Sequence, residues 1–155
     1  MTYKNIIKYW ESFLSNGDNR LKYEKSVYDY WCFCDNKKDA DSLAELVIQG
    51  IKRGTTSLVH SYEVENEDFP KIGELSIVTD WEGNPKCIIK TIKIDRLKFS
   101  DVDEKFAFIE GEGDKSLEYW RNEHIGVFSR EAKSLGFEFN EEMEVFFEEF
   151  QVIYS

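Results

Sequence analysis

Histidine, cysteine and proline are scarce in this chain of 155 residues, and basic residues are outnumbered by acidic ones. Its 20 Lys and Arg stand against 31 Asp and Glu, which gives a formal net charge of −11 at pH 7. A protein that wraps long RNA or DNA non-specifically needs a basic surface, because the neutralisation of phosphates supplies most of its affinity. The sequence therefore argues against long nucleic acid as a partner, but it is compatible with one small phosphate-bearing ligand in a locally basic site.

The few cysteines and the lack of long apolar runs indicate the compartment. Cys32 and Cys34 are two residues apart, so on a strand they point to the same face, and a disulfide between them would strain the backbone. No apolar stretch approaches the roughly 18–20 residues that a membrane-spanning helix needs. Charges also interrupt the N-terminal segment too early for a signal peptide. We expect a reduced, cytoplasmic protein with no membrane partner.

Nitrogen and sulfur ligands for a metal are also few. The chain has 2 His, His60 and His124, and no Cys-x-x-Cys pair, so the sequence gives little support to a zinc site. Glu110, Glu112 and Asp114 are spaced two apart as in a calcium or magnesium loop, but the further ligands of such a loop are missing. A turn that leads into a helix explains the same residues. We expect no metal and no cofactor.

Apolar periodicity predicts the secondary structure. Helices are expected over residues 3–14, 39–49 and 116–135, with shorter ones at 58–63 and 106–110; Asp39 is a plausible N-cap and Gly50 a plausible end of the second helix. Strands are expected at 27–33, 75–79, 86–97 and 143–154. This order predicts an α+β fold rather than alternating βαβ units. No linker or repeat divides the chain, so we expect one domain over 1–155, with an N-terminal helical extension over 1–25 and the core over 26–155.

The acidic segment near the C-terminus alternates phenylalanine with glutamate, as in Phe146, Phe147 and Phe150 among Glu144, Glu148 and Glu149. Alternation of this kind indicates a half-buried strand rather than a disordered tail. An edge strand at this place could pair two subunits, so a homodimer is a further hypothesis.

Residues 50–57 carry the strongest sign of chemistry. The stretch reads Gly50-Ile51-Lys52-Arg53-Gly54-Thr55-Thr56-Ser57, so two glycines bracket a lysine directly after a helix end. A lysine held in a partly apolar cleft can lose its proton and act as a base, with a hydroxyl three residues later as its nucleophile. In the structural alternative, Lys52 and Arg53 favour the negative end of the preceding helix, and Thr55 to Ser57 cap the next one. The spacing alone leaves both open.

The pattern Gly50-x-Lys52-x-x-Thr55-x-Ser57 resembles the signature of the ASCH superfamily, relatives of the PUA domains, as found in bacterial single-domain proteins. The similarity extends over most of the chain from Phe33 onward, through the stretches Phe33-Cys34-Asp35, Pro70-x-x-Gly73-x-Leu75, Ala107-x-x-Glu110 and Trp120-Arg121-x-x-His124. Cys34 departs from the family, which more often has glycine there.

The resemblance implies a small mixed PUA-like β-barrel with helices packed around it and a ligand cleft beside the signature. Family members are associated with RNA or modified nucleosides; some hydrolyse N(4)-acetylcytidine, and others have been described as ribonucleases. In the amidohydrolase members a Lys, a Thr and a Glu carry the reaction, and by position these correspond to Lys52, Thr55 and Glu110. We expect further contacts to the ligand from four residues, Arg53, Ser57, Arg121 and His124.

Three hypotheses follow. The first is an amidohydrolase in which Lys52 takes a proton from Thr55, and Glu110 or the charged Lys52 returns one to the departing amine. The second is a module that binds a modified nucleoside or short RNA without turnover, and the third is an interaction domain. A ribonuclease ranks below the amidohydrolase because the two histidines form no recognisable pair that could serve as acid and base. The sequence leaves the substrate open, and also whether Glu110 reaches Lys52.

Overall fold

The N-terminal helix α1 (Thr2–Leu14) packs its apolar face on strand β3 (Leu75–Thr79), far along the chain. The computed structural model describes residues 2–155. Ile6, Trp10 and Phe13 are buried in one cluster with Leu75 and Ile77. The helical spacing of these apolar side chains is the pattern that predicted the helix, because positions three and four apart share one face. No helix within residues 2–155 is long and apolar enough to cross a membrane.

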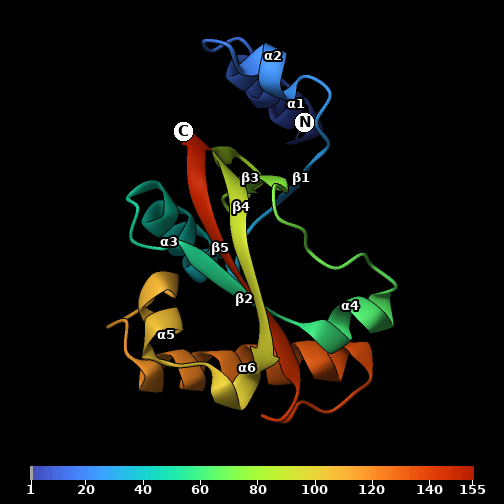
Figure 1. Ribbon diagram of the computed structural model, residues 1–155, viewed down its shortest axis with the longest axis vertical. Helices are drawn as coiled ribbons and strands as arrows, with labels where there is room; N and C mark the ends of the chain where they lie inside the picture. Colours follow the sequence, from blue (N-terminus) through green and yellow to red (C-terminus); the bar gives the residue numbers. More distant parts are fainter. Residues whose placement is uncertain (1) are drawn as a thin grey trace. The chain divides into compact units, whose positions relative to one another are not determined.

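The chain divides into two compact units. The first comprises the residues up to 50 together with 73–90 and 151–155, and the second comprises 51–72 and 91–150. Besides α1 and β3, the first unit contains α2 (Asn19–Tyr23), β1 (Tyr28–Trp31) and α3 (Lys37–Ile48). The second contains β2 (Gly54–Leu58), α4 (Val59–Glu65), the 3₁₀ helix η1 (Phe99–Asp101), α5 (Glu104–Glu110) and α6 (Leu117–Leu135). Strands β4 (Pro85–Lys98) and β5 (Glu144–Tyr154) each run through both units (Figure 1). The single domain stays a prediction.

The five strands have the order β1-β3-β4-β5-β2. In the first unit β1 runs parallel to β3, and β3 pairs antiparallel with β4. In the second unit β2 pairs antiparallel with β5, so that Thr56 lies opposite Phe147. The order corrects one expectation, because β5 is flanked by two strands and is not an edge. The argument for a homodimer that rested on an edge strand at β5 is therefore removed. The homodimer itself stays an untested prediction.

The α+β class with an N-terminal helix is confirmed. Two local expectations were wrong. Residues Thr55 to Ser57 do not cap a helix but lie in strand β2, where their backbone pairs with β5. Helix α3 begins earlier than expected, and its N-cap is Asn36, whose side chain accepts a hydrogen bond from the backbone N–H of Asp39. Asp39 therefore lies in the first turn, where its charge still favours the helix N-terminus.

The second unit has its own apolar core. It consists of seven buried residues, Leu58, Phe99, Val102, Ala107, Trp120, Phe128 and Val145. Helix α5 contacts both β2 and α6 (Figure 1). Ser116 caps α6 by accepting a hydrogen bond from the backbone N–H of Tyr119 at 3.1 Å. These contacts bring the end of α5 beside strand β2 and the first half of α6.

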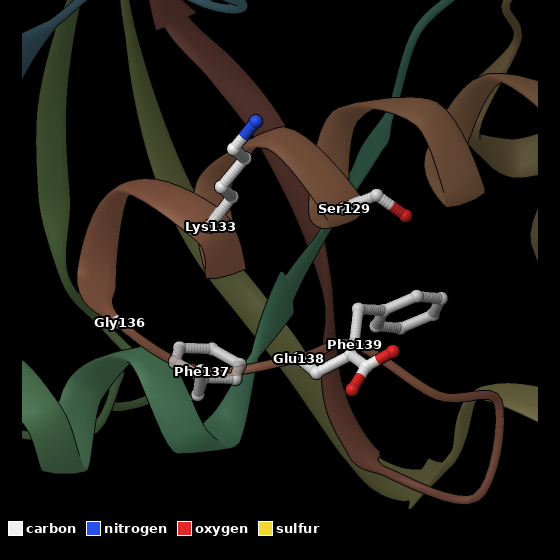
Figure 2. A pocket seen from close by; sticks show the side chains of 6 residues that line it. All are labelled: Ser129, Lys133, Gly136, Phe137, Glu138 and Phe139. Carbon is white, nitrogen blue, oxygen red and sulfur yellow. The ribbon is translucent and has the colours of Figure 1, made fainter.

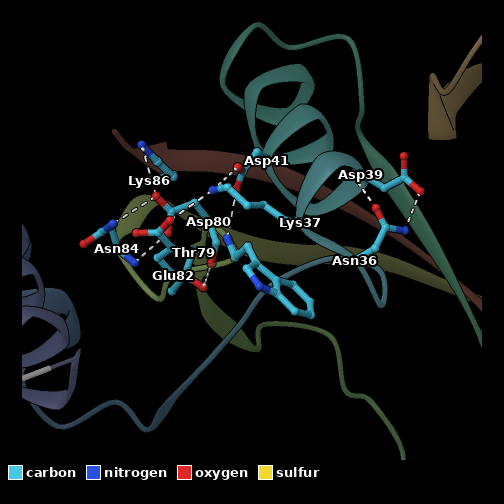
Figure 3. A network of polar contacts seen from close by, with 10 residues as sticks. Asn36, Lys37, Asp39, Asp41, Thr79, Asp80, Glu82, Asn84 and Lys86 are labelled. Atoms are coloured by element: carbon cyan, nitrogen blue, oxygen red, sulfur yellow. Dashed lines mark hydrogen bonds and ion pairs between the residues drawn. The ribbon is translucent and has the colours of Figure 1, made fainter.

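A polar network fastens the β3–β4 turn to helix α3 within the first unit (Figure 3). Lys37 lies 3.0 Å from Asp41 on the same helix and 3.1 Å from Glu82 in the turn. Asp41 also accepts a hydrogen bond from the backbone N–H of Trp81 at 2.9 Å, and this bond and Lys37 lower its pKa. Exposed ion pairs contribute little to stability, so the backbone bond is the main tether.

Cys34, the departure from the family pattern, has a left-handed backbone with φ of +65°. Glycine adopts this conformation without the steric cost that a Cβ brings. We expect Cys34→Gly to raise the free energy of unfolding by up to about 1 kcal/mol in chemical denaturation, because relief of the left-handed conformation, about 1–2 kcal/mol, exceeds the added freedom of the unfolded chain, about 0.5–1 kcal/mol. Cys32→Gly is the control, because Cys32 is not among the described residues with positive φ, and there glycine should destabilise. A destabilised Cys34→Gly variant would contradict this account.

Candidate functional site

Lys52 is buried at the entry to strand β2, with 1% of its side chain exposed. Its Nζ donates a hydrogen bond to the carbonyl oxygen of Gly54 at 2.8 Å. The same nitrogen lies 3.5 Å from Oε1 of Glu110 and 3.7 Å from Oε1 of Glu112. These three atoms are oxygen acceptors, which a protonated ammonium contacts as a donor. The surroundings of Lys52 thus match its charged form.

Glu110, the last residue of α5, is the centre of the cluster. Its Oε1 lies 2.9 Å from Nε2 of His124, besides its contact with Lys52. Its Oε2 accepts hydrogen bonds from the hydroxyl of Thr56 at 2.8 Å and from the indole N–H of Trp120 at 2.5 Å. Burial alone would raise the pKa of this carboxyl, but the charges of His124 and Lys52 hold it well below its usual range. Glu110 is therefore an ionised carboxylate with both oxygens fully occupied.

His124 lies between two acceptors on helix α6. Its Nδ1 is 2.7 Å from the backbone carbonyl oxygen of Trp120, so this nitrogen must carry a proton. Its Nε2 faces the ionised Glu110, which also only accepts. Burial would lower the pKa of the imidazole, but the Glu110 carboxylate and its hydrogen bond raise it above the ordinary value. The imidazolium form fits both contacts, and its ring stacks on that of Trp120 with centroids 4.2 Å apart.

Glu112 lies beside the same lysine in a different environment. Its side chain is 17% exposed, against 3% for Glu110. Burial and the nearby negative charge of Glu110 raise the pKa of the Glu112 carboxyl, and attraction to Lys52 only partly offsets them. The two carboxylates around Lys52 therefore differ in pKa. Glu110 is held ionised, and Glu112 gains a proton more readily.

Glu110, Glu112 and His124 also form the one set of three potential metal ligands found close together within residues 2–155. One ligand atom from each lies within 4.8 Å of the others. The Lys52 ammonium already supplies a positive charge to both carboxylates, and Nε2 of His124 is engaged by Glu110. The donor set therefore fits an ammonium ion better than a metal cation.

The structure brings together Lys52, Glu110 and His124 from the residues that the sequence singled out. Thr55 alternates with Thr56 on β2, so its half-buried side chain points to the opposite face from the one that contacts Glu110. Ser57 shares the face of Thr55 and accepts a hydrogen bond from the hydroxyl of Tyr62 at 3.1 Å.

The two predicted arginine contacts lie outside this cluster. Arg53 has an exposed side chain, and its backbone N–H donates to the carbonyl oxygen of Ile109 at 2.8 Å. Arg121 donates to the carbonyl oxygen of Ser100 at 3.2 Å, and its Nε is buried without a hydrogen-bond partner among the described residues. Neither guanidinium makes a described contact with Lys52, so their roles in binding a ligand stay predictions.

Three further members of the cluster, Thr56, Trp120 and Glu112, were not predicted as site residues. Trp120 had a sequence signal, because it lies four residues before His124 on the apolar stripe of α6. Glu112 had only its position two residues after Glu110. Thr56 could be placed only once residues 54–58 were known to form a strand.

A surface hollow of about 570 Å³ lies at the C-terminal end of α6 (Figure 2). The half-buried rings of Phe137 and Phe139 line it, together with exposed Ser129, Lys133 and Glu138. None of the predicted site residues lines this hollow. It therefore adds nothing to the chemistry of the Lys52 cluster.

Comparison with known proteins identifies the class to which this fold belongs. The ASCH domain family matches residues 29–154, and the chain belongs to this family. An ASCH domain structure from Lactobacillus crispatus JV V101 is 36% identical, with a TM-score of 0.92, and the match covers 98% of this chain and 96% of that one. Protein EF3133 from Enterococcus faecalis V583 is 30% identical, with a TM-score of 0.88, and the match covers 98% and 90% of the two chains. None of the curated proteins compared with this chain matches it. The predicted family and its PUA-like α+β fold are confirmed.

Proposed function

We propose that this ASCH domain hydrolyses the exocyclic amide of an N(4)-acetylcytidine-like nucleoside at the Lys52 cluster. The observation that carries the proposal is the buried Lys52 ammonium held between Glu110 and Glu112. Hydrolysis of an amide passes through a tetrahedral oxyanion, which a preorganised positive charge stabilises. It also needs a group that moves a proton to the departing amine. The buried Lys52 ammonium supplies the positive charge, and the two neighbouring carboxylates, which differ in pKa, supply a group that can move a proton.

The roles within the cluster follow from its contacts. Lys52 stabilises the oxyanion, and Glu110 positions Lys52 and His124 by accepting hydrogen bonds from both. The sequence predicted Thr55 as the nucleophile, and nothing in the structure tests that prediction. Because Thr55 points away from the face of β2 that contacts Glu110, the proposed reaction uses water as its nucleophile.

The test is the release of cytidine from N(4)-acetylcytidine, followed by chromatography. We expect turnover by the wild type and a loss of about 10²–10³-fold in Lys52→Met, as for removal of an oxyanion-stabilising group. Lys38→Met is the matched control, because Lys38 is exposed on α3 and its loss should leave turnover unchanged. Circular dichroism of Lys52→Met would show whether the fold is retained. Unchanged turnover in a folded Lys52→Met protein would contradict the proposal.

A second candidate function is a module that binds a modified nucleoside or short RNA without turnover. It is favoured by Phe108, which is 54% exposed on α5 although it is a large aromatic residue. Nζ of Lys115 lies 5.3 Å from the centroid of its ring, and Lys105 is exposed on the same helix. Exposed rings beside cations bind bases by stacking and phosphates by charge. No turnover, with a melting temperature raised by N(4)-acetylcytidine, would favour this function over hydrolysis.

A further inference from the structure

The two carboxylates beside Lys52 are not equivalent in their capacity to exchange a proton. Glu110 accepts from four side chains, so each of its oxygens is already occupied. A proton could join Glu110 only if one of these donors moved away. Glu110 is therefore suited to holding the cluster together rather than to proton transfer.

Glu112 has the opposite properties. Its described charged contact is with Lys52 at 3.7 Å, and its side chain is 17% exposed. The charged groups that face it are Lys52 before β2, Glu110 at the end of α5 and His124 on α6. Burial and repulsion by Glu110 raise its carboxyl pKa above the ordinary value, which brings its protonated and ionised forms closer in energy near neutral pH. It is thus the accessible titrating group of the cluster.

We propose that Glu112, and not Glu110, is the group that transfers protons at this site. This inference rests on the proposed function. The Glu112 carboxylate takes a proton from water as the water oxygen bonds to the acetyl carbon, and the carbonyl electrons move onto oxygen beside the Lys52 ammonium. When the oxyanion re-forms the carbonyl, the C–N bond breaks, and the protonated Glu112 gives its proton to the departing exocyclic nitrogen. The products are acetic acid and cytidine, and Glu112 returns to its ionised form.

The first test compares Glu112→Gln with the wild type on N(4)-acetylcytidine. We expect kcat to fall by about 10²–10⁴-fold, the usual contribution of general acid–base catalysis, with KM little changed. The acidic limb of the wild-type pH profile, which reports the ionisation of Glu112, should be absent from the residual activity. Glu118→Gln is the control, since Glu118 is an exposed carboxylate in the first turn of α6. A Glu112→Gln enzyme with wild-type kcat and pH profile would overturn the inference while leaving the proposed hydrolysis intact.

A second measurement does not depend on turnover. Carboxyl ¹³C resonances of glutamate, followed by NMR during a pH titration of the full chain, report each carboxyl directly. We expect the resonance that is missing in Glu112→Gln to titrate above the ordinary glutamate range, and that of Glu110 not to titrate in the accessible acid range. A Glu112 resonance that titrates at or below the ordinary range would overturn the inference. If the wild type shows no turnover, the proposed function fails, and this titration alone decides whether Glu112 is the proton-exchanging group.

Discussion

Replacing Glu110 with glutamine is expected to lower the free energy of unfolding by about 3–5 kcal/mol, the cost of breaking a buried ion pair. The amide carries no charge, so Lys52 and His124 would remain as buried cations without their shared counter-charge. The new NH₂ group would also meet donors, because all four groups around Glu110 donate to it. Chemical denaturation at neutral pH, followed by far-ultraviolet circular dichroism, measures the loss.

The matched control for this prediction is Glu112→Gln. Both substitutions remove a carboxylate from the surroundings of Lys52, but Glu112 is more exposed and its pKa is raised rather than lowered. Its ionised form is therefore disfavoured by folding, and we expect its replacement to change the free energy of unfolding by less than about 1 kcal/mol. Equal losses in the two variants would show that Glu110 is not the centre of the cluster.

The contact between Glu110 and His124 also makes the stability of the protein depend on pH. The pKa of Glu110 is lower in the folded protein than in the unfolded chain, so its stabilising effect is fully present above about pH 4.3, the unfolded value. That effect is lost as pH falls through the folded pKa. His124 has a raised pKa, so its stabilising effect is present below about pH 6.5 and is lost as pH rises through the folded value. The Glu110→Gln variant should therefore lack the part of the wild-type acid destabilisation that comes from Glu110.

Features that depend on local sequence could be predicted. The apolar spacing predicted helices α1 and α6, and the strands expected at 75–79 and 86–97 are β3 and β4, because these patterns depend on neighbouring residues alone. The early start of α3 shows the limit of this reasoning, because Asn36 and Asp39 are both good N-caps and the choice between them depends on backbone angles.

Features that depend on distant pairing could not be predicted from the sequence. Strand β2 reads Gly-Thr-Thr-Ser-Leu, which resembles a loop, and it is a strand because β5 pairs with it along its whole length. The same pairing buries β5 between two strands, although its alternating pattern is also typical of an edge. Strand order is a property of the whole chain, and one strand's pattern does not determine it.

The candidate site shows both limits. Lys52 and Glu110 are 58 residues apart, and only the family resemblance connected them before the structure showed their contact. His124 was recognised on an apolar stripe, but its contact with Glu110 depends on how α6 lies beside the end of α5. Glu112 could not be assigned at all, because its direction depends on the turn at Gly111.

Gly111 separates the two carboxylates, and its replacement with alanine should be among the most damaging single changes to this site. Its φ is +71°, and an added Cβ would lie 2.2 Å from the backbone carbonyl oxygen of Ile51. The left-handed conformation costs about 1–2 kcal/mol for a residue with a Cβ, and overpacking against an atom that cannot rotate away costs about 1–3 kcal/mol more. We expect chemical denaturation to show a loss of about 2–5 kcal/mol.

Gly50 provides the matched control for Gly111→Ala. Its φ of +75° is nearly the same, but an added Cβ would meet no atom within 4 Å. Gly50→Ala should therefore cost only the conformational part, about 1–2 kcal/mol. The difference between the two variants measures the close approach of Gly111 to Ile51, the residue before Lys52. Since relief of that clash must move the turn between Glu110 and Glu112, a folded Gly111→Ala protein should also lose turnover, whereas Gly50→Ala should keep it. Equal stability and equal activity in the two variants would show that this contact does not position the carboxylates.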